Sequence, residues 1–123
     1  MTIADTDVLI DFLSNRGEAA RVDDLLARGV LYTTVITRFE LLSGAKNPRA
    51  LGRLMDLLDA VPALDLDTGA ADAASEIRRS LEQVGHSIGM ADSLIAGIVL
   101  SNGGTLLTRN LQHFERVQGL KLA

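Results

Sequence analysis

Apolar positions along the chain alternate between short continuous runs and longer segments with a helical period. The short runs predict strands at residues 3–4, 30–33, 105–108 and 120–122. A fifth run at 61–64 contains Pro62, which restricts it to an edge strand or a plain connection. Because strands and helical segments alternate, the pattern predicts an α/β fold, with a mostly parallel sheet covered by helices on both faces.

The periodic segments share apolar residues at three- and four-residue spacing and end at glycine or polar residues, which predicts six helices. The first follows Asp5, with Thr6 or Asp7 as its N-cap. The predicted helices run from about Val8 to the turn near Gly17, Glu18 to Gly29, Thr34 to about Ser43, Pro48 to about Leu58, Thr68 to Gly85, and Met90 to about Leu100.

Composition limits the function classes. The chain has 123 residues, which predicts one domain spanning 1–123. It has no cysteine, which excludes disulfides and thiolate metal sites and is typical of a reducing cytoplasm. No run is long enough to cross a bilayer, so we expect a cytoplasmic protein without a membrane partner. A net charge of −4 and 3% aromatic residues argue against a broad basic or base-stacking surface for nucleic acid.

Three acids occupy positions where a parallel sheet exposes its carboxyl edge: Asp5 after the first strand, Glu40 after the second, and Asp92 ahead of the 105–108 strand. Each acid also has a purely structural interpretation. Asp5 can cap a helix, Glu40 can complete a capping box with Thr37, and Asp92 can stabilise a helix N-terminus. Taken together, the three acids favour a shared site.

Clustered carboxylates need a cation. Two unit charges about 4 Å apart repel by about 4 kcal/mol at an effective dielectric constant near 20. Hard oxygen ligands without supporting His or Cys suit Mg²⁺ or Mn²⁺ rather than zinc. Such ions activate water and stabilise charge on phosphate oxygens, so the acids predict phosphate chemistry.

The 106–114 segment brings further polar groups to the same edge of the sheet. Thr108 and Asn110 are placed to hold a water or the Asp5 carboxylate, and Arg109 to pair with a phosphate. The structural alternative is a polar turn with a solvated Arg109. Neither His86 nor His113 lies in a motif for nucleophilic catalysis.

In this order and spacing the motifs resemble PIN-domain ribonucleases, in particular the VapC-type toxins of toxin–antitoxin pairs. The resemblance covers essentially the whole chain. It rests on the motifs Asp5-Thr6-Asp7-Val8-Leu9-Ile10, Thr37-x-x-Glu40-Leu41, Asp92-Ser93-Leu94-Ile95-Ala96, Thr108-Arg109-Asn110 and Phe114. It implies a sheet of order 3-2-1-4-5 and an endoribonuclease that uses Mg²⁺ or Mn²⁺ to activate water.

By the family pattern, Asp5, Glu40 and Asp92 are the metal-binding and catalytic acids, and the supporting polar or phosphate-contacting residues are Thr6, Thr108, Arg109 and Asn110. The sequence departs from the pattern at Asn110, where a fourth acid is often found, and at His113, where some relatives carry another acid. Occupancy of a second metal site is therefore open. Asp7 or Asp11 could add a carboxylate to the site, although Asp7 is expected to cap the first helix and Asp11 to be solvated.

The resemblance also implies an RNA substrate, a homodimer and a small VapB-like antitoxin that enters the active-site groove. The helices around Val22–Leu26 and Leu51–Leu58 are candidates for these surfaces, although their apolar residues also suit a core. Two rival functions stay open. One is a non-catalytic PIN-like binding module that has lost part of the metal site. The other is a receiver-like domain or another Mg²⁺-dependent phosphatase, against which the lack of a suitable late lysine argues.

Overall fold

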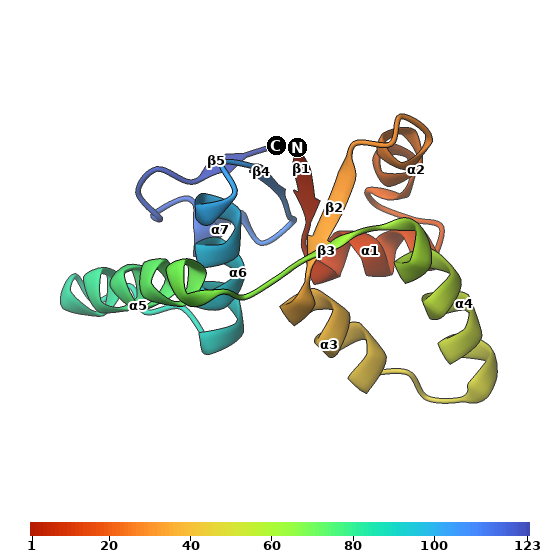
Figure 1. Cartoon of the computed structure of the whole chain (residues 1–123), viewed down its shortest axis with the longest axis horizontal. Helices are drawn as coiled ribbons and strands as arrows, with labels where there is room; N and C mark the ends of the chain where they lie inside the picture. Colours follow the sequence, from red (N-terminus) through yellow and green to blue (C-terminus); the bar gives the residue numbers. More distant parts are fainter.

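The computed structural model describes residues 1–123 as a five-stranded sheet with seven helices (Figure 1). The strands are β1 (Thr2–Ala4), β2 (Leu31–Thr34), β3 (Ala63–Leu64), β4 (Thr105–Leu107) and β5 (Lys121–Leu122). The helices are α1 (Thr6–Leu13), α2 (Ala19–Ala27), α3 (Val35–Ser43), α4 (Pro48–Ala60), α5 (Thr68–Gln83), α6 (Met90–Ser101) and α7 (Leu111–Phe114). None of the helices combines the length and the apolar character that crossing a membrane requires.

The sheet has the order β3-β2-β1-β4-β5, and every neighbouring pair is parallel. The predicted fold and strand order are therefore confirmed. The chain passes from β1 to β2 and β3 on one side and then to β4 and β5 on the other, so the topology reverses between β1 and β4. Ligands of open α/β sheets bind outside the strand ends at such a switch point. Asp5 and Thr108 directly follow these two strands.

Alternation along the central strands builds a core on each face. Ile3 and Leu106 belong to the cluster that includes residues of α5 and α6, whereas Ala4 and Leu107 belong to the cluster with residues of α1 to α4. Figure 1 shows α5, α6 and α7 on one side of the sheet and α2 and α4 on the other. Both faces are covered, as the near-continuous apolar strands predict.

Helix α6, which carries Asp92, packs closely along α5. A Cβ atom at Gly97 would lie 2.5 Å from the carbonyl oxygen of Ala70 and 2.8 Å from the Ala74 Cβ. Only glycine permits this approach, so small residues on both helices fix the position of α6.

Several local predictions are wrong. Leu51 and Val84 continue the apolar spacing of the fourth and fifth predicted helices, which favours burial, but they are 41% and 64% exposed. Leu51 lies in the first turn of α4, which projects beyond the sheet in Figure 1, and Val84 is the C-cap residue after α5. Helix α7 was not predicted, because four residues are too few to establish a helical period.

Candidate active site

Asp5 ends the first strand and begins the first helix. Its backbone N–H donates to the Leu107 carbonyl, 2.9 Å away, which fixes the residue at the switch point. One carboxylate oxygen accepts from the Thr6 N–H and the other from the Thr108 hydroxyl, each at 2.8 Å. Asp5 itself is therefore the N-cap, and the prediction of Thr6 or Asp7 as cap is wrong, because Asp5 is extended and the helix begins at Thr6. The expected contact between Thr108 and Asp5 is present.

Burial raises the pKa of the Asp5 carboxyl from 3.8 to about 6. This value is a net result: the charges of Asp7 and Asp92 add to the effect of burial, while the hydrogen bonds from Thr108 and Thr6 oppose it. No lysine or arginine forms an ion pair with Asp5, Asp7 or Asp92. Three carboxylates thus influence one another at the switch point, and no lysine or arginine neutralises them.

Asp7 lies in the first turn of α1 and is not a cap. Its Oδ2 accepts from the Arg109 backbone N–H at 3.0 Å and from the Thr108 hydroxyl at 3.4 Å. Its Oδ1 is the one buried side-chain oxygen or nitrogen of the chain that lacks a hydrogen-bond partner. A buried carboxylate oxygen without a partner is costly, and a cation would relieve that cost.

Glu40 is held at the site by α1. Its Oε1 accepts a 2.7 Å hydrogen bond from the Thr6 hydroxyl, which also lies 3.1 Å from the Thr37 hydroxyl. The Thr34 hydroxyl caps α3 by accepting from the Thr37 N–H, so the capping-box interpretation of Glu40 is wrong. Glu40 is thus joined to Asp5 through one residue, Thr6.

Asp92 lies in the first turn of α6 and contacts His113, a pairing that the sequence did not predict. Its Oδ2 is 2.7 Å from His113 Nδ1, on the unpredicted helix α7. The Asn110 amide nitrogen is also 2.7 Å from His113 Nδ1. Residues three apart are neighbours on a helix, so the spacing from Asn110 to His113 could have predicted their contact, but only once helix α7 is known.

Arg109 pairs with a buried acid. Its Nε lies 2.9 Å from Asp11 Oδ2, and Arg16 approaches the other oxygen at 4.0 Å. The prediction that Asp11 is solvated is wrong: the residue is 1% exposed, because the turn after α1 and the β4–α7 connection close over it. Half of the Arg109 side chain stays exposed, at the position where a phosphate contact was predicted.

The donor set fits a hard divalent cation, although the side chains as they stand do not enclose one. No three His, Asp or Glu side chains are grouped to hold an ion. The carboxylates of Asp5, Asp7 and Asp92 nevertheless lie near one another without a lysine or arginine partner, and Asp7 Oδ1 has no hydrogen-bond partner. Carboxylate oxygens of this kind are the ligands that Mg²⁺ and Mn²⁺ prefer.

An apolar groove adjoins this site. It has a volume of about 370 Å³ between α1, α3 and the start of α4, and Thr6 and Glu40 form part of its lining. Other lining residues include Ile10, Leu13 and Ala50. The helix stripes considered in the sequence for partner binding are instead largely core: Val22, Leu25, Leu54, Leu57 and Leu58 are all buried.

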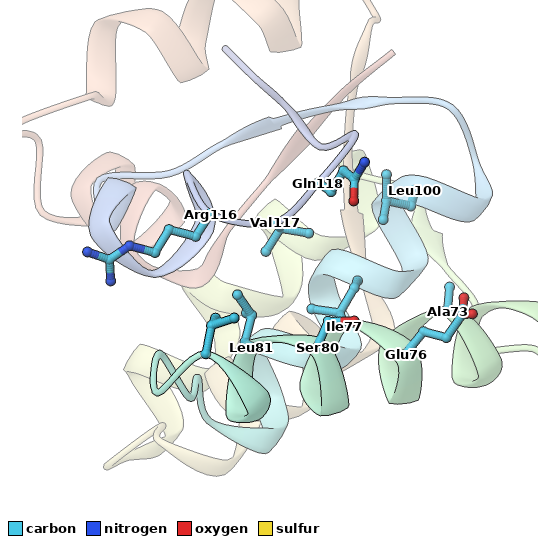
Figure 2. A pocket seen from close by; sticks show the side chains of 10 residues that line it. Ala73, Glu76, Ile77, Ser80, Leu81, Leu100, Arg116, Val117 and Gln118 are labelled. Atoms are coloured by element: carbon cyan, nitrogen blue, oxygen red, sulfur yellow. The ribbon is translucent and has the colours of Figure 1, made fainter.

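A separate cavity of about 400 Å³ lies between α5, the end of α6 and residues 116–118 (Figure 2). Figure 2 shows Ile77 and Leu81 of α5 facing Val117 across it. None of the predicted site residues lines this cavity. The site residues predicted from the sequence therefore lie at the strand ends and not in this cavity.

Comparisons with known proteins identify the family of this chain. Residues 2–120 match the family model described as the PIN domain. A tRNA(fMet)-specific endonuclease VapC of Shigella flexneri is 31% identical over 121 residues, which cover 95% of this chain and 92% of that protein. Two solved complexes are similar in structure: a DNA-bound VapBC of Salmonella typhimurium and the VapBC2 of Rickettsia felis bound to a promoter DNA fragment. Their TM-scores are 0.84 and 0.86, their identities 31% and 25%, and each match covers 99% of this chain and 96% of the other.

Proposed function

This chain belongs to the PIN domain family, and we propose that it is a VapC-type toxin, an endoribonuclease that requires Mg²⁺ or Mn²⁺. One observation of the structure supports the proposed metal dependence. The buried Asp5 carboxylate stands at the switch point beside Asp7 and Asp92 without a basic partner. Such an arrangement is unfavourable for the protein alone and becomes favourable when a cation binds.

The residues that would hold the cation are Asp5, Glu40 and Asp92, and the unpartnered Oδ1 of Asp7 could add a further ligand. When bound, a divalent ion supplies positive charge that stabilises the phosphate oxygens and activates a water for attack. The Thr108 hydroxyl keeps the Asp5 carboxylate oriented, and the Thr6 hydroxyl does the same for Glu40. Two of the acids are thus held in place before any ligand arrives.

Arg109 is the proposed contact for an RNA phosphate. Its Nε is engaged by Asp11, but the side chain is 51% exposed, and a guanidinium has five N–H donors in all. The terminal donors are therefore available for a phosphate beside the acids. The pairing with Asp11 holds the side chain in place, which lowers the entropy cost of that contact.

The apolar groove is the proposed site for a segment of a VapB-like antitoxin. It shares Thr6 and Glu40 with the acid site, so a chain that fills it ends beside the acids and blocks them.

A homodimer is proposed through the large apolar residues that remain exposed on α3 and at the start of α6, Phe39 at 68% and Met90 at 65%. Exposed aromatic and methionine side chains are enriched at protein interfaces.

RNA cleavage by purified protein tests the proposed function. Asp5→Asn and Asp92→Asn are expected to lower Mg²⁺- or Mn²⁺-dependent cleavage by at least 100-fold while the far-UV circular dichroism spectrum is unchanged. The matched control is Asp59→Asn, an exposed acid on α4, which should cleave like the wild type.

Equal cleavage by all four proteins would refute the assignment. The rival function, a non-catalytic PIN-like module, is favoured by Asn110 and by the absence of a closed ligand cluster. That alternative predicts no cleavage by the wild type and harmless expression without an antitoxin, whereas the toxin should arrest growth.

A further inference from the structure

The imidazole of His113 lies against the acid site, and its Nδ1 atom makes two contacts that require opposite hydrogen-bonding roles. Its Nδ1 is 2.7 Å from Asp92 Oδ2 and 2.7 Å from the side-chain amide of Asn110. The carboxylate oxygen needs a proton on this nitrogen, whereas an amide N–H needs its lone pair. One ring nitrogen offers either a proton or a lone pair, so these two contacts cannot both be satisfied.

Rotating the Asn110 amide by 180° resolves the conflict only in part. The carbonyl oxygen then faces Nδ1, and a single N–H is shared between two acceptors in a three-centre hydrogen bond. In that orientation, however, Asp92 Oδ2 and the Asn110 carbonyl oxygen both adjoin an unprotonated Nδ1, so three atoms with free lone pairs are neighbours. A cation that accepts all three lone pairs satisfies every group.

The spacing suits a small divalent ion. Neighbouring ligands of an octahedral ion with bonds of about 2.1 Å are about 3 Å apart. The two 2.7 Å separations at His113 are within a few tenths of an ångström of that value. The His113 side chain is also 50% exposed, so an ion can reach it from solvent.

From this geometry we propose that His113 Nδ1 is a metal ligand together with Asp92 and Asn110, and that the site therefore prefers Mn²⁺ to Mg²⁺; this rests on the proposed function. Imidazole nitrogen is a softer ligand than carboxylate oxygen and binds Mn²⁺ better than Mg²⁺. The preference belongs to this chain's own residues, because it depends on the nitrogen at position 113.

Pulsed electron paramagnetic resonance of bound Mn²⁺ gives a readout that is independent of catalysis. The chain has only two histidines, so an imidazole ¹⁴N coupling must come from His86 or His113. The untagged wild type should show this coupling. It should also bind Mn²⁺ at least tenfold more tightly than Mg²⁺, with Mg²⁺ measured by displacement of Mn²⁺.

The variants H113A and H113D should both lose the ¹⁴N coupling. H113A should bind Mn²⁺ about tenfold more weakly, with little change in its affinity for Mg²⁺. H113D should bind Mg²⁺ more tightly than the wild type does, because it replaces the imidazole with a hard carboxylate ligand. His86→Ala is the matched control, because that exposed ring contacts Arg116 and no acid, and this variant should keep the coupling.

Three outcomes separate the two proposals. Mn²⁺ binding without ¹⁴N coupling, or coupling that survives H113A, would overturn the ligand role of His113 and leave the nuclease assignment intact. Absence of any Mn²⁺ or Mg²⁺ binding, together with metal-independent cleavage or none, would overturn the proposed function itself. Thermal unfolding of each variant establishes that it is folded, as expected for a substitution at a half-exposed side chain.

Discussion

Asp5 combines a structural role with the proposed catalytic one. As the N-cap of α1 it stabilises the fold, yet its charge is buried beside Asp7 and Asp92. The raised pKa means that the ionised form is less stable in the folded protein than in the unfolded chain. A residue that binds a cation in function therefore costs stability in the cation's absence, which is a common property of active sites.

This conflict predicts the pH dependence of stability. A carboxyl with a folded pKa of about 6 and an ordinary value of 3.8 binds its proton more tightly in the folded state. Its contribution to the free energy of unfolding is therefore fully present below pH 3.8, falls as the pH rises to about 6, and is then lost, by about 3 kcal/mol in all. Asp5→Asn should remove this fall and stabilise the metal-free protein at pH 7.5. Urea unfolding of both proteins in EDTA between pH 4 and 8 measures the difference.

A difference in stability that is constant across this pH range would contradict the prediction. Adding Mn²⁺ at pH 7.5 supplies a second comparison. Because an ion that binds only the folded state stabilises it, the melting temperature of the wild type should rise, and that of the Asn variant should rise much less.

At the scale of elements, the β4–α7 connection is held by α1. Asp7 accepts a hydrogen bond from the Arg109 backbone N–H, and Asp11 pairs with the Arg109 side chain. Helix α1 therefore holds both the backbone and the side chain of Arg109. Thr108 and Asn110 flank it, and both reach the site. The ion pair between Asp11 and Arg109 thus positions a loop that carries three of the proposed site residues.

The predicted contribution of this pair can be measured by a double-mutant cycle. Asp11 is buried and Arg109 is half exposed, so removal of Asp11 leaves an arginine that water can partly solvate, whereas removal of Arg109 leaves a buried carboxylate. We expect Asp11→Asn to lower the free energy of unfolding by about 2 kcal/mol, less than for a fully buried pair, with most of this loss shared with Arg109→Met. Urea denaturation of the two single variants and the double variant gives the coupling energy.

The control cycle uses Asp24 and Arg28, whose 3.2 Å pair on α2 is exposed on both sides. Its coupling energy should stay below about 0.5 kcal/mol. Similar coupling in the two cycles would mean that Asp11 does not hold the loop. A lower cleavage rate of Asp11→Asn, at unchanged metal affinity, would identify it as a positioning residue.

For the whole molecule, the proposed antitoxin groove and the acid site form one continuous surface between α1 and α3. Thr6 and Glu40 belong to both. A partner segment bound in the groove therefore touches the acid site without any change in the fold. Inhibition by direct occlusion follows from this continuity.

The substitution Ala50→Arg tests this surface, because it places a long charged side chain in the groove. When the protein is co-expressed with the product of the neighbouring open reading frame, Ala50→Arg should weaken the complex at least tenfold, as measured by calorimetry, and restore growth arrest. The control is Ala20→Arg, at an exposed position on α2. Unchanged affinity of the Ala50→Arg variant, or equal loss in both variants, would place the partner elsewhere.

Much of the fold and of the site was predictable from local patterns. The alternation of apolar runs and helical periods predicted a parallel α/β sheet, and the resemblance implied its order of 3-2-1-4-5. The positions of Asp5, Glu40 and Asp92 at the sheet edge followed from this topology. The roles of Asp7 and Asp11 were predicted wrongly, because the groups that contact them, Thr108 and Arg109, lie about 100 residues away in the chain.

The sequence by itself thus determined which elements form and which acids reach the carboxyl edge of the sheet, because periodicity and caps are properties of neighbouring residues. Only the tertiary structure decided which of those acids are buried, paired or left without a partner. It also decided that His113 lies against Asp92, since that contact depends on the packing of α7 against α6. Burial and charge pairing are set by contacts between distant segments, and no local pattern records them.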